Sequence, residues 1–398
     1  MNQRSIPTFL PASEKEAVQI VTEARAGATR LGFFGGGSRA HLGRPANADA
    51  RLGTAAMSGI AFYDPGEMVI CAAAGTAVAE IEEAITPHGQ MLPFEPMDHR
   101  RLFGTGGAPT VGGLVAANVS GPRRISCGAA RDSLIGLRLI SGRGDLLRCG
   151  GRVMKNVTGL DLVKLNCGAH GTLGLVTQAT LKLLPRPDCR ATLSIPLLED
   201  KIAIAALSAA LGSPYSVSAA AHLPASTGRS QALTIIRIEG LQESVNYRLA
   251  ALLVLLEPFG TARIHEDDVS DELWRDVGDA ASLAEPNDAA LWRVGIAPSR
   301  APDFIRRLGD TRQAHFYDWG GALVWVATMA TPAAARTVRD ALGHYGGHAT
   351  LVRAPSALRE VVDVFQPLST PLQRLTRGIK ASFDPDSICN AGRMYAGV

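Results

Sequence analysis

Apolar residues in the first half of the chain alternate between helical and strand spacing. Ser13 and Glu16 form a capping box, and the apolar positions after them recur every three or four residues, which predicts a helix over residues 14–26. A second helix is expected over residues 78–85, with Thr76 as its N-cap. Strand-like runs cover residues 29–34, 68–73, 134–140, 145–150 and 174–185. This succession predicts an α/β or α+β layout.

The second half of the chain, from about residue 191, is richer in strand-like runs. Helix-like runs separate them and cover residues 203–211, 244–256 and 333–342. AHFYDWGGALVWVAT predicts a hairpin with its turn at residues 318–321. Paired strands backed by helices indicate an antiparallel sheet with helices on one face. A final helix over residues 371–379 is expected to lead into a polar tail.

Residues 101–128 contain seven glycines together with Thr110, Asn118 and Ser120. Five of these glycines could turn successive main-chain N–H groups toward anionic oxygens: Gly104, Gly106, Gly107, Gly112 and Gly113. A glycine-rich surface loop is the alternative explanation. Glycine turns also lie at strand ends within residues 35–38 and 169–185. Three such turns favour one extended phosphorylated cofactor over three unrelated loops.

Length, charge and hydropathy exclude several classes of function. A chain of 398 residues can hold two or three domains. A net charge of +3, without a basic run interleaved with aromatic residues, argues against nucleic acid as a partner. The longest apolar run, residues 249–259, is far shorter than the roughly 20 residues that span a bilayer. The N-terminus lacks the pattern of a secretory signal, so we expect a cytoplasmic protein without a transmembrane segment.

Cysteine and histidine spacing predicts no metal site on this chain. The six cysteines have no CxxC or CxxxC spacing, so any iron–sulfur relay is expected on another chain. His344 and His348 are separated by two glycines that disfavour a helix, and we interpret them as surface residues. Paired histidines that would activate a hydroxy acid are not evident in the second half. Pro109 breaks a possible GxGxxG fingerprint, and GxxxxGK[ST] and GxSxG are absent.

Several motifs resemble a known family. GGGS, PTVGGLVAANVSGPRRISCGAARDSLIGLRLISGRG and GGRVMKNVTGLDLVKLNCGAHGTLGLVTQATLKLLPRP resemble the FAD-binding half of the vanillyl-alcohol-oxidase type flavoproteins. More narrowly, SGPRR with RD, VMKNVTG and the terminal CNAGRMY resemble the family of FAD-binding E subunits of bacterial glycolate oxidase. The resemblance covers about residues 10–187 and the last dozen residues.

The resemblance implies an α+β fold in three parts. Residues 1–187 would form a two-part FAD-binding domain of the PCMH type. Residues 188–377 would form a cap domain on the substrate side, with an antiparallel sheet and helices. Residues 378–398 would be a C-terminal tail that returns to the FAD-binding domain. FAD would lie between the first two parts.

The resemblance also implies the residues that contact FAD. They are Gly35, Gly36, Gly37, Ser38, Thr110, Gly112, Gly113, Asn118, Ser120, Gly121, Gly128, Arg131, Asp132 and Val176. The first four would supply pyrophosphate donors, and Val176 would lie near the adenine or ribose. A mutual surface ion pair is the alternative for Arg131 and Asp132. Some relatives link the flavin covalently; His41 lies too far along the loop and Cys127 is the other candidate, so non-covalent FAD is expected.

Oxidation of a 2-hydroxy acid requires a cation for the carboxylate and a base for the hydroxyl proton. Candidates for the cation are Arg123, Arg124, Lys155 and Arg393, of which Lys155 and Arg393 are also considered as catalytic residues. No base is assigned.

The resemblance implies a subunit that oxidises glycolate to glyoxylate with a second flavin subunit and an iron–sulfur subunit, which could hold it at the inner membrane. The alternatives are an electron-transfer or assembly subunit, and a stand-alone FAD-linked D-2-hydroxy-acid oxidase or dehydrogenase.

Overall fold

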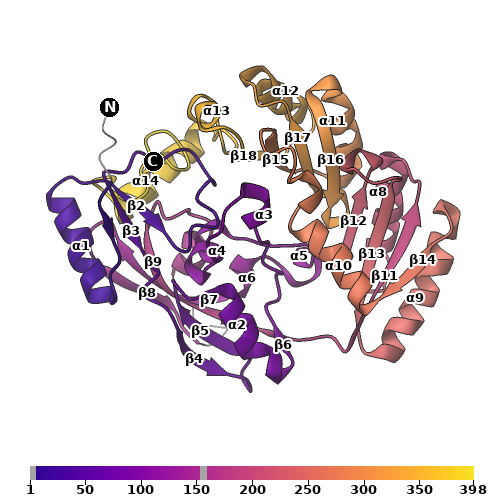
Figure 1. Cartoon of the computed structure of the whole chain (residues 1–398), viewed down its shortest axis with the longest axis horizontal. Helices are drawn as coiled ribbons and strands as arrows, with labels where there is room; N and C mark the ends of the chain where they lie inside the picture. Colours follow the sequence, from indigo (N-terminus) through magenta and orange to yellow (C-terminus); the bar gives the residue numbers. More distant parts are fainter. Residues whose placement is uncertain (1–5, 153–158) are drawn as a thin grey trace.

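The computed structural model describes residues 6–152 and 159–398. Helices and mostly antiparallel strands are mixed along the whole chain, which confirms the predicted α+β class. Figure 1 shows two bodies side by side, with the N-terminal sheets in one and a large sheet from the second half of the chain in the other. The chain's last helix and its C-terminus lie against the N-terminal body (Figure 1).

The first helix, α1 (Glu14–Ala26), has the predicted bounds because its N-terminus is capped. The Ser13 hydroxyl accepts from the Glu16 N–H at 3.2 Å, and the Glu16 carboxylate accepts from the Ala12 N–H at 2.9 Å. A three-stranded parallel sheet lies beside α1, in the order β1 (Thr8–Phe9), β3 (Ala50–Gly53), β2 (Leu31–Phe34). Strand β2 leads directly into the GGGS turn.

A five-stranded antiparallel sheet forms the centre of the N-terminal body. Its order is β4 (Ile60–Asp64), β5 (Val69–Ala73), β9 (Gly174–Lys182), β7 (Leu134–Ser141), β8 (Leu146–Gly150). The predicted hairpin is β7 with β8. The predicted cap of α2 (Val78–Ile85) is wrong: the N-cap is Ala77, because the Thr76 hydroxyl instead accepts from the Gly59 N–H at 2.9 Å.

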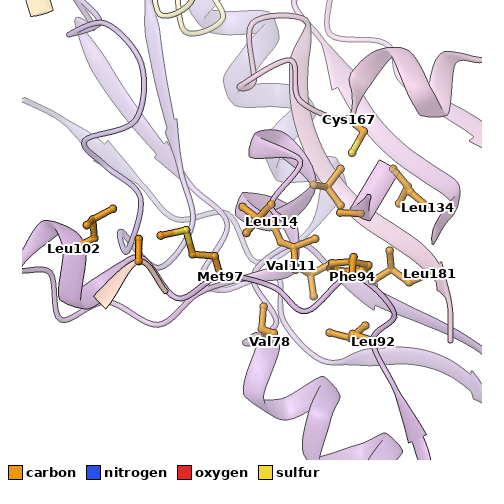
Figure 2. Packing of buried hydrophobic residues seen from close by; sticks show 14 of the residues in the cluster. Val78, Leu92, Phe94, Met97, Leu102, Val111, Leu114, Leu134, Cys167 and Leu181 are labelled. Atoms are coloured by element: carbon orange, nitrogen blue, oxygen red, sulfur yellow. The ribbon is translucent and has the colours of Figure 1, made fainter. Parts of the chain in front are cut away.

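Short elements connect this sheet to the glycine-rich segment. They are β6 (Gln90–Met91), β10 (Leu184–Pro185), α3 (Arg100–Phe103), α4 (Val111–Ala117), α5 (Arg124–Cys127), α6 (Ala130–Ser133) and α7 (Leu162–Asn166). Figure 2 shows Val111 and Leu114 of α4 beside Phe94, with Leu181 of β9 nearby. All four side chains are at most 2% exposed, and burying each contributes about 1.5–3 kcal/mol. This packing fixes α4 on the sheet.

The second body is built on an eight-stranded sheet. Its order is β14 (Arg263–Glu266), β11 (Cys189–Pro196), β13 (Leu233–Gly240), β12 (Ala219–Leu223), β16 (Arg312–Asp318), β17 (Leu323–Thr328), β15 (Ala290–Gly295), β18 (His348–Arg353). Its helices are α8 (Asp200–Leu211), α9 (Gln242–Leu256), α10 (Asp267–Gly278), α11 (Ala301–Arg307) and α12 (Pro332–Gly343). The predicted hairpin is β16 with β17, and β14, β18, α10 and α11 were not predicted.

Alternation along the strands of this sheet buries both of its faces. Ile236 packs with the helices α8 and α9, whereas the neighbouring Ile235 belongs to the core that continues into the N-terminal body. In the same way, Val324 belongs to the helix-covered core and the neighbouring Trp325 to the core that continues into the N-terminal body. The cap sheet therefore shares a continuous apolar core with the FAD-binding half.

The C-terminal segment closes the structure. After α13 (Ser356–Val361), α14 (Thr370–Phe383) extends beyond the predicted 371–379. It ends where the buried Lys380 ammonium donates to Asp384, to the Thr172 carbonyl and to the Cys389 carbonyl, at 2.6–2.9 Å. Residue 377, a predicted domain boundary, lies inside α14. The division of the chain into domains at residues 187 and 377 stays a prediction.

Candidate functional site

A cavity of about 440 Å³ lies where β2, α4, β9 and the C-terminal tail meet. Its volume is in the range of small-molecule sites. Nine of the residues singled out from the sequence line it: Gly35, Gly36, Gly37, Ser38, Thr110, Gly112, Gly113, Val176 and Arg393. Segments more than 350 residues apart in sequence therefore build one site.

The glycines of the GGGS turn are required by close packing between two loops. A Cβ on Gly36 would lie 2.0 Å from the Ala108 carbonyl oxygen, and a Cβ on Gly35 would lie 2.2 Å from the Thr110 hydroxyl. Gly37 has φ +86° with nothing within 4 Å of its Cβ position. The turn thus presents main chain without side chains to the cavity, as a phosphate-bearing ligand requires.

Arg39, directly after this turn, has an unused donor beside the cavity. Its Nε donates to His99 Nδ1 at 3.3 Å and its Nη2 to the Met97 carbonyl at 3.1 Å. Its Nη1 has no hydrogen-bond partner among the described residues and would lie 3.6 Å from a Cβ on Gly113. Burial lowers the pKa of Arg39 to about 10, so the side chain is still cationic at neutral pH. A buried, charged and unsatisfied donor fits an anionic diphosphate.

Six of the residues implied as FAD contacts do not line this cavity: Asn118, Ser120, Gly121, Gly128, Arg131 and Asp132. They organise the segment after α4 instead. Asn118 Oδ1 accepts from the Arg131 N–H at 3.0 Å, Ser120 Oγ from the Ala130 N–H at 3.0 Å, and Asp132 from the Ala129 N–H at 2.8 Å. Among the described residues Arg131 and Asp132 form no ion pair with each other. A Cβ on Gly121 would lie 2.4 Å from the Glu95 carbonyl oxygen.

The cavity also contains residues that sequence reasoning missed. His170 and Asn390 line it, and the Asn390 amide donates to the His170 carbonyl at 2.7 Å. Arg359 closes the cavity by donating to the carbonyls of His41 and Gly43. The motifs that contain Asn390 and His170 were signals for these two residues, but nothing local indicated Arg39 or Arg359.

The two candidates for a covalent flavin link are not among the residues that line the cavity, although Ala40 and Leu42 on either side of His41 are. His41 is exposed and packs against the Phe103 ring at 5.7 Å between centroids. Cys127 is on α5, where it accepts from the Ser126 hydroxyl.

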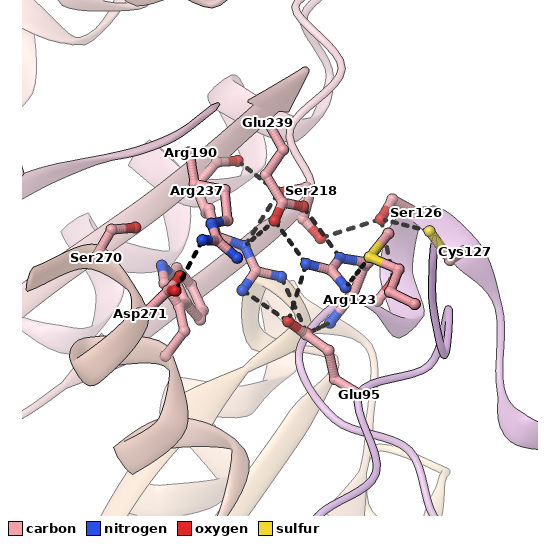
Figure 3. Close-up of polar contacts among 12 residues, drawn as sticks. Glu95, Arg123, Ser126, Cys127, Arg190, Ser218, Arg237, Glu239, Ser270 and Asp271 are labelled. Carbon is pink, nitrogen blue, oxygen red and sulfur yellow. Dashed lines mark hydrogen bonds and ion pairs between the residues drawn. The ribbon is translucent and has the colours of Figure 1, made fainter. Parts of the chain in front are cut away.

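Arg123 is committed to a buried ion-pair network and is not a free cation for a substrate. Figure 3 shows it between Glu95 and Glu239, with Arg237 on the other side of Glu95. Burial opposes ionisation of Glu239, but Arg237 and Arg123 outweigh it and hold the pKa near 2. Arg123 is therefore removed from the candidates. Arg124 lies beside Trp319, and Lys155 lies outside the described residues.

A pair of buried histidines exists in the cap, contrary to the sequence-based expectation. His315 Nε2 lies 2.8 Å and His222 Nε2 lies 3.4 Å from the Asp200 carboxylate, which also accepts from the Tyr317 hydroxyl at 2.7 Å. Burial raises the pKa of Asp200, but these partners outweigh it and hold it well below the ordinary range. The described residues contain no metal-binding group of three or more His, Cys, Asp or Glu. His344 and His348 are exposed.

Comparison with known proteins gives the class. Residues 7–150 match the family model described as an FAD binding domain. p-Cresol methylhydroxylase has the same fold, with a TM-score of 0.72 at 12% identity over 97% of this chain and 88% of that one. The fold and the cavity define an FAD-binding flavoprotein of the PCMH type, which confirms the predicted fold and FAD as the cofactor.

The nearer relatives give the family. The chain is 36% identical over 383 residues to glycolate oxidase subunit GlcE of Escherichia coli (strain K12), covering 95% of this chain and 96% of that protein. It is 28% identical over 233 residues to glycolate oxidase subunit GlcD of Bacillus subtilis (strain 168), covering 58% of this chain and 45% of that protein. The chain belongs to the glycolate oxidase subunit GlcE family, as the motifs predicted, and is an FAD-linked oxidoreductase. No helix among residues 6–152 and 159–398 is long and apolar enough to cross a membrane.

Proposed function

We propose that this chain is the FAD-binding subunit of a glycolate oxidase complex, which oxidises glycolate to glyoxylate and passes electrons through its flavin to a separate iron–sulfur subunit. The observation that supports this most is the similarity to GlcE over 95% of the chain. That similarity includes the cap as well as the FAD-binding half, so the proposal applies to the whole chain.

When bound, FAD supplies the two-electron acceptor for oxidation of the carbon that bears the hydroxyl. We assign the diphosphate to the turn Gly35–Ser38 and to the free Nη1 of Arg39, because both present donors to the cavity. Thr110, Gly112, Gly113 and Val176 form its walls. Asn118, Ser120, Gly121, Gly128, Arg131 and Asp132 support the loop behind α4. We assign Arg393, which lines the cavity, to the cofactor rather than to catalysis.

We propose that FAD is held without a covalent bond. The cavity lining contains neither His41 nor Cys127, which supports this assignment.

The second flavin subunit and the iron–sulfur subunit are proposed partners. The printed names of GlcE and GlcD describe subunits, which supports a multi-subunit assembly. Helix α9 lies on the side of the cap away from the FAD-binding half (Figure 1), and we propose its exposed residues as a surface for the second flavin subunit: Tyr247 is 70% and Val254 73% exposed. A cytoplasmic location, with any membrane contact made through partners, stays a prediction.

An electron-transfer or assembly subunit without its own substrate chemistry is the second candidate. It is favoured by the position of His222 and His315, which bind Asp200 on the helix-covered side of the cap sheet. Tyr317, two residues after His315, belongs to the same helix-covered core. These histidines are therefore not offered to a ligand at the domain interface.

The test uses the purified full chain and its visible spectrum. We expect FAD in the supernatant after acid precipitation; colour retained in the pellet would contradict the non-covalent assignment. Arg39→Met is expected to weaken FAD binding by about tenfold or more, whereas Arg300→Met, an exposed cap residue, leaves it unchanged. Absence of any bound FAD would refute the proposal.

Substrate chemistry is tested by adding glycolate to the same protein without oxygen. Bleaching of the flavin band supports oxidation at this chain's own flavin. A flavin that is reduced only after the partner subunits are added favours the electron-transfer role. Turnover by the isolated chain with an artificial acceptor and D-lactate, in preference to glycolate, would support the stand-alone dehydrogenase.

A further inference from the structure

Two arginines from different domains meet at the indole ring of Trp319. The guanidinium carbon of Arg124, on α5, lies 4.6 Å from the ring centroid, and that of Arg293, on β15, lies 4.8 Å from it. Neither side chain makes a hydrogen bond or ion pair within residues 6–152 and 159–398. The two remaining segments, residues 1–5 and 153–158, contain no Asp or Glu. This is a cationic pair without a carboxylate partner.

Two other arginines at the same interface have partners for their terminal nitrogens. Arg237 donates to both carboxylate oxygens of Glu95 at 2.8 and 3.0 Å. Arg353 donates to four main-chain carbonyl groups at 2.6–3.1 Å. Partly buried arginines here are therefore normally paired, because an unpaired charge away from water is costly. Arg124 and Arg293 depart from that rule.

Neither arginine forms an ion pair among the described residues, although the charge of Asp132 acts to raise the pKa of Arg124 and that of Asp318 acts to raise the pKa of Arg293. Burial, and then Arg124, lower the pKa of Arg293 to about 10, so it is still charged at neutral pH. The nearby Asp318 carboxyl accepts from the Trp319 N–H at 2.7 Å, and burial raises its pKa to about 7. Asp318 is thus only partly ionised near neutrality. The site carries a net positive charge that a small anion would compensate.

The backbone holds Trp319 in a defined position between the domains. Its indole N–H donates to the Gly121 carbonyl at 3.1 Å, which joins the cap to the loop after α4. Its φ of 53° is in the left-handed region, which is strained for a bulky residue. Strain of this kind is concentrated at functional sites.

The cationic pair is close to the cofactor cavity. His99 contacts Arg39, which lines that cavity, and the charge of Arg293 contributes to lowering the pKa of His99, after burial and Arg39. The charge of Arg293 therefore acts on a side chain that contacts the cavity wall.

We propose that Arg124 and Arg293, held against Trp319, form a binding site for the carboxylate of a small organic acid at the interface of the two domains. The planar guanidinium group suits a carboxylate because it can donate two parallel hydrogen bonds. The inference rests on the proposed function, since it assigns the site to the acid that the flavin oxidises. It adds the carboxylate-binding residues that the sequence left open.

The test is a titration of the FAD-loaded full chain with oxalate, a small dicarboxylate that carries no hydrogen for oxidation, followed by calorimetry. Arg124→Met and Arg293→Met keep the length of the side chain and remove its charge. Each is expected to weaken oxalate binding about 10- to 100-fold. Arg293→Lys is expected to retain part of the oxalate affinity. Arg300→Met replaces an exposed arginine of the same domain and is expected to retain all of the oxalate affinity. Glycolamide, which has no carboxylate, should bind much more weakly than glycolate.

Specific results would overturn the inference. The carboxylate site is refuted if both methionine variants bind oxalate as tightly as the wild type. It is also refuted if the wild type does not bind oxalate at about 10 mM. Equal affinity for glycolamide and glycolate would likewise refute a carboxylate site. The FAD content of each variant reports on folding and on the cofactor site independently. Normal FAD with unchanged oxalate binding refutes the carboxylate site alone. Absence of FAD from the wild type refutes the proposed function, and the same oxalate titration on the FAD-free chain then tests the site by itself.

Discussion

Asn390 of the C-terminal tail accepts a hydrogen bond from the Phe33 N–H at 2.8 Å, 357 residues earlier in the chain. Phe33 is in β2, the strand that leads into the GGGS turn. The same Asn390 side chain donates to the His170 carbonyl at 2.7 Å. One amide therefore joins three segments of the cofactor cavity, and the tail is part of the site rather than an appendage.

Asn390→Ala is expected to lower both stability and FAD affinity. It leaves the Phe33 N–H and the His170 carbonyl without their partner, and an unsatisfied buried group costs about 1–3 kcal/mol. Alanine also tolerates the φ of 42° at this position less well than asparagine. We expect roughly tenfold weaker FAD binding, measured by fluorescence titration. Asn246→Ala, on the exposed surface of α9, is the matched control; equal affinity of both variants would contradict the prediction.

Gly36→Ala and Gly106→Ala separate packing glycines from exposed ones in the two glycine-rich turns. A Cβ on Gly36 would lie 2.0 Å from the Ala108 carbonyl oxygen, whereas nothing lies within 4 Å of a Cβ on Gly106. The first substitution forces the two loops apart and should cost about 1–3 kcal/mol, with loss of bound FAD. The second should behave as wild type. The FAD content of each variant is measured after gel filtration. A normal FAD content in Gly36→Ala would disprove the packing argument.

Arg123→Ala is expected to weaken the contact between the domains. It removes the guanidinium 2.6 Å from the buried Glu239 and leaves Arg237 to balance both Glu239 and Glu95; such uncompensated buried charge costs about 3–5 kcal/mol. Urea unfolding followed by circular dichroism measures the loss. Arg101→Ala, an exposed arginine on α3, controls for removal of a positive charge. A loss below about 1 kcal/mol would mean that the network is not what holds the interface.

The buried His99 should make the protein less stable in mild acid. Burial, and then Arg39, lower its pKa to about 3, whereas the unfolded chain has the ordinary value near 6.5. Between these values the unfolded state binds the extra proton, so the free energy of unfolding falls as the pH drops below 6.5. For one such histidine, the free energy of unfolding falls by about 2 kcal/mol between pH 6.5 and pH 5.

Urea unfolding at pH 5, 6.5 and 8 measures this slope, and His99→Gln should make it shallower. Asp318 acts in the opposite direction: its pKa is raised to about 7, so its contribution to stability is lost as the pH rises through 7. Asp318→Asn is therefore the complementary variant and should make the acid-side slope steeper. An unchanged slope in His99→Gln would contradict the assignment.

Local sequence signals predicted the elements whose residues interact with near neighbours. The bounds of α1 follow from its capping box, and the β7–β8 and β16–β17 hairpins follow from their turns. The Thr76 cap failed because that hydroxyl is used by Gly59, 17 residues away. The GGGS turn was found because its glycines are adjacent in sequence, whereas Arg39 gave no signal because its partners are 58 and 60 residues distant.

The sequence alone determined the fold class, the family and the glycine turns, because these depend on spacing within short segments and on motifs that remain contiguous. Only the tertiary structure decided which charged side chains are available. Arg123 and Arg124 are neighbours in one motif, yet Arg123 is neutralised by Glu95 and Glu239 while Arg124 faces Trp319 and Arg293. The difference is set by side chains between 28 and 195 residues away in the sequence, and electrostatic energy depends on distances in space that no local pattern encodes.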